Sequence, residues 1–450
     1  MITAKTVHII GVGGIGTSAV ARWWKGQGAT VSGSDMHTSA ILEDLDEAGI
    51  EVKIGHFADN IPRDCDLVIY SAAVPATNVE RQVANERGIK EWSYPKFLGK
   101  LAAEKKTIAV SGTNGKSTTT AMIAGILIEA GYDPTVILGT KVPDWPEKNL
   151  RIGKSDWFVV EACEHMANML SIHPNTAVIT NIEEDHLDYY RDLSHIRDTF
   201  QQWIDCKDTC SQVVLNRDDA ESQKLDAKYV SWFGVDHRKI EDGGQTFDVA
   251  GVPVILHIPG AFNAQNAAAA LTAAHVVGVP DEPALKALAD FKGTWRRFEH
   301  VGMWTPTSLT LRGAGSSDVY SDYAHHPTAC AGSIAAFKEF FPDRRLVVVF
   351  EPHQHSRTTE LFDEFVTAFD DADVLLVSEI YEVAGRTESK QISSKDLVEK
   401  IQARGTVKDV RFTKDQAEAE AQLASLVAPQ DVIVLMGAGS IDELARKLTQ

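Results

Sequence analysis

The sequence predicts an α/β protein with three domains, each built on a mostly parallel sheet. Short apolar runs alternate with helical patterns along the chain, which is typical of doubly wound α/β units. Two strand-to-helix junctions are rich in glycine, one at Gly11 and one that begins at Ser111. The chain has 450 residues, enough for two or three domains that each have their own core.

The composition argues against a nucleic-acid partner and against a membrane-spanning protein. The formal net charge is −19, so a polyanion would be repelled, and an anionic substrate must be held by local cations. No run reaches the roughly 18 apolar residues of a membrane span, and the first residues lead directly into a strand. The five cysteines are scattered, and we expect them to be reduced. We therefore expect a cytoplasmic protein.

The first domain, predicted over residues 1–103, is Rossmann-like. Its first turn, GVGGIG, matches G-x-G-x-x-G at Gly11, Gly13 and Gly16. Asp35 follows about twenty residues later, where a dinucleotide-binding fold places its ribose ligand. Strands are predicted at 7–10, 29–35 and 65–71, and helices at 17–28, 40–49 and 78–87. Taken alone, this pattern favours an NAD(P)-linked dehydrogenase.

The central domain, predicted over residues 104–297, contains the strongest single motif, SGTNGKSTTT at 111–120. The motif lies between a β-branched strand and a helix, so backbone N–H groups and the positive helix end face one concavity suited to phosphate. Lys116 would reach the β- and γ-phosphates, and the Ser117 or Thr118 hydroxyl would lie on Mg²⁺. Val110 replaces the first glycine of the strict P-loop pattern. The alternative is a glycine-rich turn with a surface lysine.

Two residues at the ends of predicted strands in this domain are candidate metal ligands. They are Glu161 in FVVEACE and His186 in TNIEEDHLDYY. A carboxylate that ends an apolar strand carries a desolvation cost, so its position suggests a cation nearby. Each residue could instead be an ordinary loop residue. The other predicted elements are strands at 155–162, 176–182 and 211–216 and a buried Ala-rich helix at 263–277.

The third domain, predicted over residues 298–450, carries two polar clusters at strand ends. YSDYAHHPTA and VVFEPHQHSRT contribute Asp322, Tyr323, His325, His326, His353, His355 and Arg357. Ligands bind at the carboxyl ends of strands in open α/β sheets. A zinc site and exposed polar loops are the alternatives. Strands are predicted at 318–323, 344–351, 372–379 and 431–439.

In order and spacing these motifs resemble those of the Mur ligases over essentially the whole chain. The motifs are GTNGKSTTT, EACE, TNIEEDHLDYY, GAFNAQNAAAA, GTWRRFE, SDYAHHPTA and FEPHQHSRT. The resemblance implies a UDP-sugar-binding N-terminal domain, an ATP-binding P-loop central domain and a Rossmann-like C-terminal domain that closes over the site. It implies an ATP-dependent amide ligase of peptidoglycan precursor synthesis, with Mg²⁺ as cofactor, for which Mn²⁺ can substitute.

In the branch that this chain resembles, such a ligase joins L-alanine to the lactyl carboxylate of UDP-N-acetylmuramate through an acyl phosphate. We expect a monomer or homodimer. For ATP the resemblance implies Gly112, Thr113, Asn114, Gly115, Lys116, Ser117, Thr118, Asn266, Arg297 and Asp322. For Mg²⁺ it implies Ser117, Glu161 and His186.

The resemblance also implies residues for the other two substrates. For the incoming amino acid they are His353 and Arg357, with Tyr323 and His326 nearby. For the UDP-sugar they are Gly13, Gly14, Ile15, Asp35, His56 and Ser71. The implied catalytic residues are Lys116, Glu161, His186, His353 and Arg357.

Departures from the alanine-adding branch leave the amine open. Gln354 stands where those enzymes usually have an arginine, and FEP replaces FQP. Phe262 replaces a usual histidine, and EACEHMANML lacks the usual acidic continuation. A murein peptide is the alternative amine. A catalytically silent nucleotide-sensing protein and a dehydrogenase are the alternative functions, of which the dehydrogenase leaves Lys116, Glu161 and His186 without a role.

Overall fold

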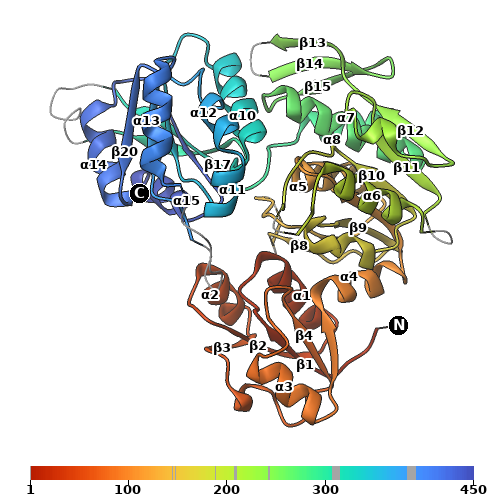
Figure 1. Ribbon diagram of the computed structural model, residues 1–450. Coiled ribbons are helices and arrows are strands. Elements are labelled where there is room, and N and C mark those ends of the chain that lie inside the picture. Colours follow the sequence, from red (N-terminus) through yellow and green to blue (C-terminus); the bar gives the residue numbers. More distant parts are fainter. Residues whose placement is uncertain are drawn as a thin grey trace.

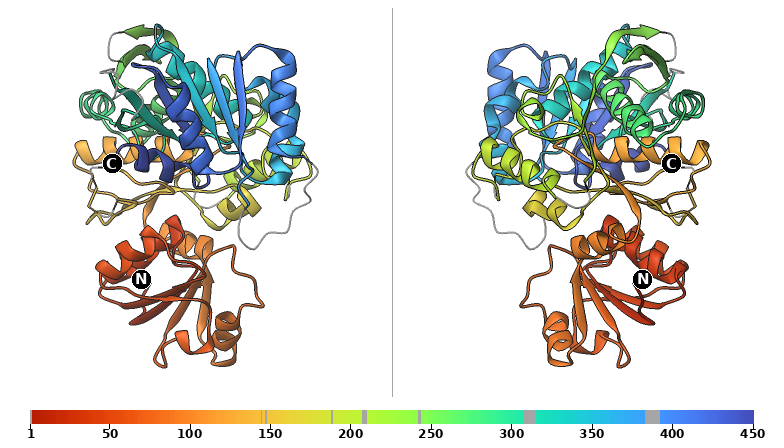
Figure 2. Two further views of the ribbon diagram at one scale, coloured as in Figure 1. Left: turned by 90° about the vertical axis from the view of Figure 1, so that its left-hand side faces the viewer. Right: turned by 90° about the vertical axis from the view of Figure 1, so that its right-hand side faces the viewer.

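The chain folds into three α/β domains, each built on a mostly parallel sheet, as Figure 1 shows. The computed structural model describes residues 2–143, 145–146, 148–187, 189–206, 210–241, 244–306, 315–382 and 392–450. The N-terminal domain lies below the other two domains in both views of Figure 2, and those two lie side by side in Figure 1. The predicted α/β class with mostly parallel sheets is confirmed.

The N-terminal domain has a five-stranded parallel sheet in the order β3-β2-β1-β4-β5. Its strands are β1 (Thr6–Ile10), β2 (Thr30–Asp35), β3 (Glu51–Ile54), β4 (Leu67–Tyr70) and β5 (Lys90–Ser93). Its helices are α1 (Ile15–Gly26), α2 (Ala40–Glu47), η1 (Ala58–Asn60), α3 (Val79–Glu86) and α4 (Tyr94–Ala102). The strand order reverses between β1 and β4, so the loops after these two strands diverge and leave a crevice.

The central domain has a seven-stranded sheet in the order β12-β11-β10-β6-β9-β7-β8, in which only β8 is antiparallel among the described strands. The strands are β6 (Lys106–Ser111), β7 (Thr135–Ile137), β8 (Leu150–Arg151), β9 (Trp157–Glu161), β10 (Thr176–Ile179), β11 (Gln212–Asn216) and β12 (Val230–Phe233). The helices are α5 (Lys116–Glu129), η2 (His165–Ser171), α6 (Leu193–Ile204), η3 (Ser222–Lys224), α7 (Ala261–Val276) and α8 (Asp281–Ala289).

Helices α5 and α7 form the centre of this domain. Both are apolar around most of their circumference, as expected for helices buried on all sides. The run of alanines in α7 lets the two helices pack closely. The predicted Ala-rich core helix is confirmed, with its start two residues earlier, at Ala261.

A three-stranded antiparallel sheet, β13 (Asp236–Glu241), β14 (Gly244–Val249) and β15 (Val252–Leu256), was not predicted from the sequence. Its first strand is polar and largely exposed, so it lacks the apolar alternation of a half-buried strand. The turn between β14 and β15 places Ala250 and Gly251 at φ values of 50° and 84°. Two such residues in succession are typical of a tight hairpin.

The C-terminal domain has a six-stranded sheet in the order β16-β17-β21-β18-β19-β20. Its strands are β16 (Glu299–Trp304), which is antiparallel, β17 (Ser317–Asp322), β18 (Leu346–Phe350), β19 (Val374–Ser378), β20 (Asp409–Thr413) and β21 (Val432–Met436). Its helices are α10 (Pro327–Phe340), α11 (His355–Glu360), α12 (Phe362–Thr367), α13 (Ser394–Arg404), α14 (Gln416–Leu426) and α15 (Ile441–Leu448).

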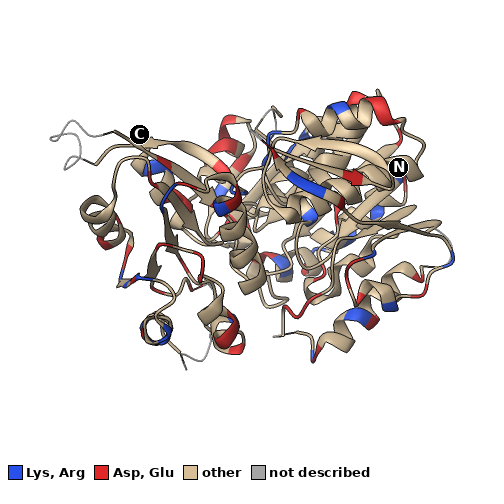
Figure 3. Ribbon diagram, turned by 90° about the horizontal axis from the view of Figure 1, so that it is seen from above, with Lys and Arg blue, Asp and Glu red and all other residues tan. Residues whose placement is uncertain are grey.

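The surface carries charges of both signs. Figure 3 shows Lys and Arg interspersed with Asp and Glu on the helices and loops. Within the described ranges, none of the helices is long and apolar enough to cross a membrane. The predicted domain boundaries, after residues 103 and 297, lie between α4 and β6 and directly before β16.

Gly99 allows α4 to approach η2, and its replacement by alanine should destabilise the contact between the first two domains. A Cβ atom at Gly99 would lie 1.8 Å from the carbonyl oxygen of Ser171. Because that atom belongs to the backbone, we expect Gly99→Ala to cost about 1–3 kcal/mol and to lower the thermal midpoint.

Gly125 in α5 is the matched control, because a Cβ atom there would meet nothing within 4 Å. Gly125→Ala should raise the midpoint, since glycine in a helix interior is about 0.5–1 kcal/mol less favourable than alanine. Equal midpoints for both variants in a thermal melt would contradict this account of the contact.

Candidate functional site

The loop between β6 and α5 is shaped by two glycines. Gly112 has φ 135° and Gly115 has φ 84°, values that side chains rarely adopt. A Cβ atom at Gly112 would lie 2.0 Å from Thr180 Oγ1, and one at Gly115 would lie 2.2 Å from Asn266 Oδ1. No side chain caps the start of α5. The first N–H groups of the helix are therefore available to an anion.

Lys116 lies over this loop. Its Nζ donates hydrogen bonds to the carbonyls of Gly112 (2.6 Å) and Thr113 (3.0 Å) and to Glu164 Oε1 (2.9 Å). Burial disfavours the ammonium form, but Glu164 and the other acidic groups nearby outweigh it, so the pKa of Lys116 is raised. The loop thus holds a fixed positive charge.

Ser117 and Glu161, two of the predicted metal ligands, are in contact. Ser117 Oγ donates to Glu161 Oε2 at 2.8 Å, and the same oxygen accepts from the Gly139 N–H at 3.0 Å. Across the residues that the structure describes, no three His, Cys, Asp or Glu side chains are grouped to hold a metal by themselves. One carboxylate and one hydroxyl still fit Mg²⁺, which is commonly bound by few protein oxygens together with substrate phosphates.

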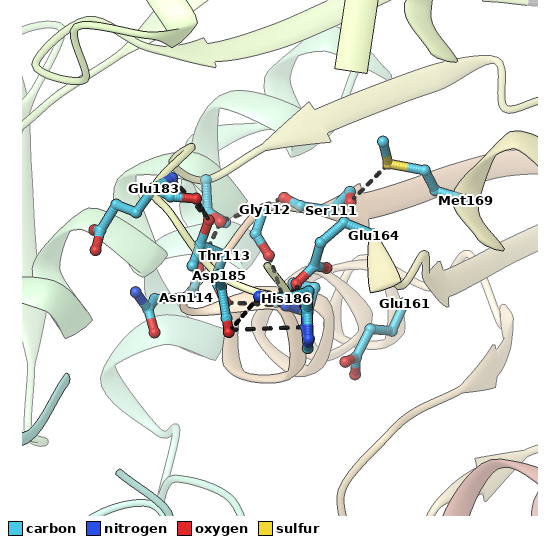
Figure 4. A network of polar contacts seen from close by, with 12 residues as sticks. Ser111, Gly112, Thr113, Asn114, Glu161, Glu164, Met169, Glu183, Asp185 and His186 are labelled. Carbon is cyan, nitrogen blue, oxygen red and sulfur yellow. Dashed lines mark hydrogen bonds and ion pairs between the residues drawn. The ribbon is translucent and has the colours of Figure 1, made fainter. Parts of the chain in front are cut away.

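His186, the third predicted ligand, lies near Glu164 (Figure 4). Its Nε2 is 3.5 Å from Glu164 Oε1, and its ring stacks on His165 with 4.3 Å between centroids. Glu164 is buried, and its Oε2 has no hydrogen-bond partner. No role was assigned to Glu164 from the sequence, although it is the second acid of the EACE motif.

A cavity of about 410 Å³ lies between the central and C-terminal domains. The predicted ATP residues that line it are Asn114, Gly115, Thr118, Asn266, Arg297 and Asp322. Aromatic and aliphatic side chains, among them Phe233 and Phe262, form its apolar part. Asp322 accepts hydrogen bonds from the N–H groups of Phe298 and Ala324, while burial raises its pKa. An apolar cavity with a few convergent polar groups beside a phosphate loop has the character of a nucleoside site.

The polar residues at the ends of β17 and β18 meet the central domain. Arg357 Nη2 donates to Asp185 Oδ1 at 3.0 Å, and His326 Nε2 lies 3.1 Å from the Glu184 carbonyl oxygen. His353 Nδ1 is 3.5 Å from Arg357 Nη1. Tyr323 lies under the guanidinium of Arg297, 5.2 Å from ring centroid to Cζ. The structure therefore brings both C-terminal motifs next to the loop that carries His186.

The N-terminal glycine loop is held by Asp35. Asp35 Oδ2 accepts from the Gly13 N–H at 2.8 Å, and Gly14 begins α1 without a side-chain cap. Gly11, with φ 75°, passes so close to Ser71 that a Cβ atom would lie 2.9 Å from the Cβ of Ser71. These predicted residues therefore surround one turn, at the end of β1 where the strand order reverses.

A second cavity, of about 150 Å³, lies between this turn and the central domain. It is lined by Ile15 and Tyr94 from the N-terminal domain and by Gly139, Glu161 and Cys163 from the central domain. Glu161 thus faces the cavity while it accepts the hydrogen bond of Ser117. Glu161 therefore contacts the start of α5 and borders a cavity that is also bordered by the N-terminal turn.

His56, predicted as a substrate contact, belongs to a buried network around Glu80. Its Nδ1 lies 3.1 Å from Ser34 Oγ and 3.4 Å from Glu80 Oε1. Glu80 also accepts from Ser34 Oγ and Asn60 Nδ2, both at 2.6 Å, and contacts His8. Burial alone would raise the pKa of Glu80, but these hydrogen bonds outweigh it and lower the pKa to about 2.

Family models match all three domains. The model described as "Mur ligase family, catalytic domain" matches residues 6–106, and "Mur ligase middle domain" matches residues 110–274. The model described as "Mur ligase, glutamate ligase domain" matches residues 307–439. Together they span most of the chain.

Relatives of known name and structure match the chain over nearly its full length. The UDP-N-acetylmuramate–L-alanine ligase of Caldanaerobacter subterraneus is 35% identical and covers 99% of this chain and 97% of its own. The UDP-N-acetylmuramate–L-alanine ligase of Aromatoleum aromaticum is 36% identical and covers 99% of this chain and 98% of its own. The crystal structure of UDP-N-acetylmuramate–alanine ligase from Thermotoga maritima superposes with a TM-score of 0.82 at 28% identity, over 98% of each chain. A murein peptide ligase from Psychrobacter arcticus shares the fold, with a TM-score of 0.69 at 22% identity, over 99% of this chain and 98% of its own.

The Glu80 network predicts an acid-sensitive N-terminal domain. The pKa of Glu80 is lowered in the folded chain, so the carboxylate stabilises the fold above its ordinary pKa of 4.5, and this contribution is lost as the pH falls toward about 2. Glu80→Gln should therefore reduce stability at pH 7 by about 1–3 kcal/mol, because buried donors lose their charged acceptor. Urea unfolding followed by tryptophan fluorescence measures this loss.

The difference between the wild type and Glu80→Gln should shrink between pH 4.5 and pH 2. The control is Glu51→Gln, because the exposed Glu51 forms a surface pair with Lys53. A difference for Glu80→Gln that does not change with pH would show that the carboxylate charge is not what the network stabilises.

Proposed function

Because this chain belongs to the Mur ligase family, we propose that it joins an amino acid to UDP-N-acetylmuramate at the expense of ATP. The expected amine is L-alanine, and the acceptor is the lactyl carboxylate. The observation that carries this proposal is the position of Glu161, which contacts Ser117 of the phosphate loop and lines the cavity that leads to the N-terminal glycine loop. A phosphate donor and a second nucleotide-linked substrate can meet there.

The reaction needs two displacements. A carboxylate oxygen attacks the γ-phosphorus and ADP leaves, and the amine nitrogen then displaces inorganic phosphate from the acyl carbon. Lys116 would neutralise the transferring phosphoryl group from its position over the loop. Mg²⁺, with Ser117, Glu161 and His186 as its residues, would polarise the phosphoryl oxygens when bound.

The ATP residues are divided between two domains, so closure of the C-terminal domain completes the site. Asn266 lies on α7, whereas Asp322 lies at the end of β17, and both line the 410 Å³ cavity. Closure would exclude water from the acyl phosphate, which water would otherwise hydrolyse. We expect the reaction in the cytoplasm, where both nucleotides are made, carried out by a monomer or a homodimer.

The incoming amino acid would be held by His353 and Arg357, with Tyr323 and His326 nearby. These residues form one cluster against the loop that carries His186. Gln354 brings no charge where the alanine-adding branch usually has an arginine. A peptide amine therefore stands as the alternative to L-alanine.

Phosphate release should depend on all three substrates. With ATP, Mg²⁺ and UDP-N-acetylmuramate present, L-alanine should stimulate phosphate release well above the rate with D-alanine. The L-Ala-D-Glu-diamino-acid peptide is the comparison amine, and stimulation by this peptide alone would indicate recycling. If no amine stimulates phosphate release, both the L-alanine and the peptide form of the proposal are contradicted.

Lys116→Ala should separate phosphoryl transfer from binding of the UDP-sugar. We expect kcat to fall by about 10²–10³-fold, because a preorganised charge at the transferring group is removed. The dissociation constant for UDP-N-acetylmuramate, measured by calorimetry, should stay within about twofold, since that ligand is assigned to another domain. Lys106→Ala, at the opposite end of β6, is the control. Equal loss of both functions in Lys116→Ala would refute the division of roles.

A further inference from the structure

An ion pair between Asp185 and Arg357 connects the central and C-terminal domains. Arg357 Nη2 lies 3.0 Å from Asp185 Oδ1, and the side chains are only 7% and 12% exposed. Asp185 precedes His186 in the loop after β10, whereas Arg357 lies in α11, 172 residues later. The contact therefore exists only while the C-terminal domain lies against the central domain.

The guanidinium has a donor without a partner among the residues that the structure describes. Within them, Arg357 Nε is buried and makes no hydrogen bond, and Nη1 has His353 Nδ1 at 3.5 Å. Buried donors are nearly always paired, so an unpaired one beside a cluster of polar side chains indicates an acceptor supplied by a ligand. The planar guanidinium group matches the planar, charged carboxylate group, so a carboxylate is the expected acceptor.

The Asp185 carboxylate makes a direct ion pair with Arg357 inside the interface, where both side chains are largely buried. Since the described partner of the Arg357 Nη2 group is this carboxylate, Asp185 determines the direction of the guanidinium plane. A neutral side chain of the same shape would hold that plane more weakly, because its hydrogen bond to the guanidinium lacks the assisting negative charge.

We propose that Asp185 is a positioning residue for the incoming amino acid: it orients Arg357 from the neighbouring domain so that the free Nε–H meets the substrate carboxylate. This inference rests on the proposed function and extends it to a residue to which no role was assigned. Recognition of the amine then depends on domain closure, because Asp185 belongs to the central domain and Arg357 belongs to the C-terminal domain. The expected ligand is an amine that carries a carboxylate, rather than a simple amine.

The test is Asp185→Asn, assayed with the amine that the wild type uses. The KM for that amine should rise about tenfold, the size of a lost charge-assisted interaction, with a smaller change in kcat. The KM values for ATP and UDP-N-acetylmuramate and the Mg²⁺ dependence should stay within about twofold. Asp185→Glu, which keeps the charge but moves it, should give an intermediate KM, and it serves as the second variant if Asp185→Asn fails to fold.

The matched control is Arg238→Gln. Arg238 forms another ion pair between the same two domains, with Glu339 at 2.6 Å, away from the residues assigned to the amine. Its loss should leave the amine KM unchanged. An unchanged or lower amine KM in Asp185→Asn would overturn the proposal, as would a parallel shift of all three KM values or of the Mg²⁺ dependence. A wild type without turnover would instead refute the proposed function itself, and this inference with it.

Discussion

The turn between β6 and α5 has room only for glycine at two positions, and the rest of the site is arranged around it. Gly112 passes against Thr180 at the end of β10, and Gly115 passes against Asn266 of α7. These approaches bring the sheet and α7 close to the start of α5, so residues from distant parts of the chain surround one anion site. A side chain at either glycine would push the sheet or α7 away from the start of α5, even if every polar side chain of the site were unchanged.

Around that turn, charge is concentrated locally in a protein of net charge −19. Lys116, Arg297 and Arg357 are each restrained by a carboxylate or an aromatic ring. Fixed cations of this kind need little reorganisation when an anion arrives. The N-terminal glycine loop is held separately, by the Asp35 carboxylate across its turn.

Much of this arrangement could be predicted from the sequence, because parallel α/β units leave a strong local pattern and place their loops at one edge of the sheet. The sequence reveals which residues follow β6, β9 and β17, but not which side chains then pair. Glu164 and Asp185 were missed for that reason: their partners, Lys116 and Arg357, are 48 and 172 residues away. Their positions in the motifs could have indicated them, because Glu164 is the second acid of EACE and Asp185 directly precedes His186. The sheet β13–β15 was missed because its first strand is polar and its pairing rests on a turn.

The central claim is that the two glycine loops bind two different nucleotides: the first binds the UDP-sugar and the second binds ATP. The most direct measurement is a crystal structure of the full chain with UDP-N-acetylmuramate and a non-hydrolysable ATP analogue. The account predicts the analogue's phosphates at 112–117 with its base in the cavity between Asn266 and Asp322, and the UDP diphosphate at Gly13 and Gly14. An ATP analogue bound at the first loop, or an empty second loop at saturating nucleotide, would contradict it.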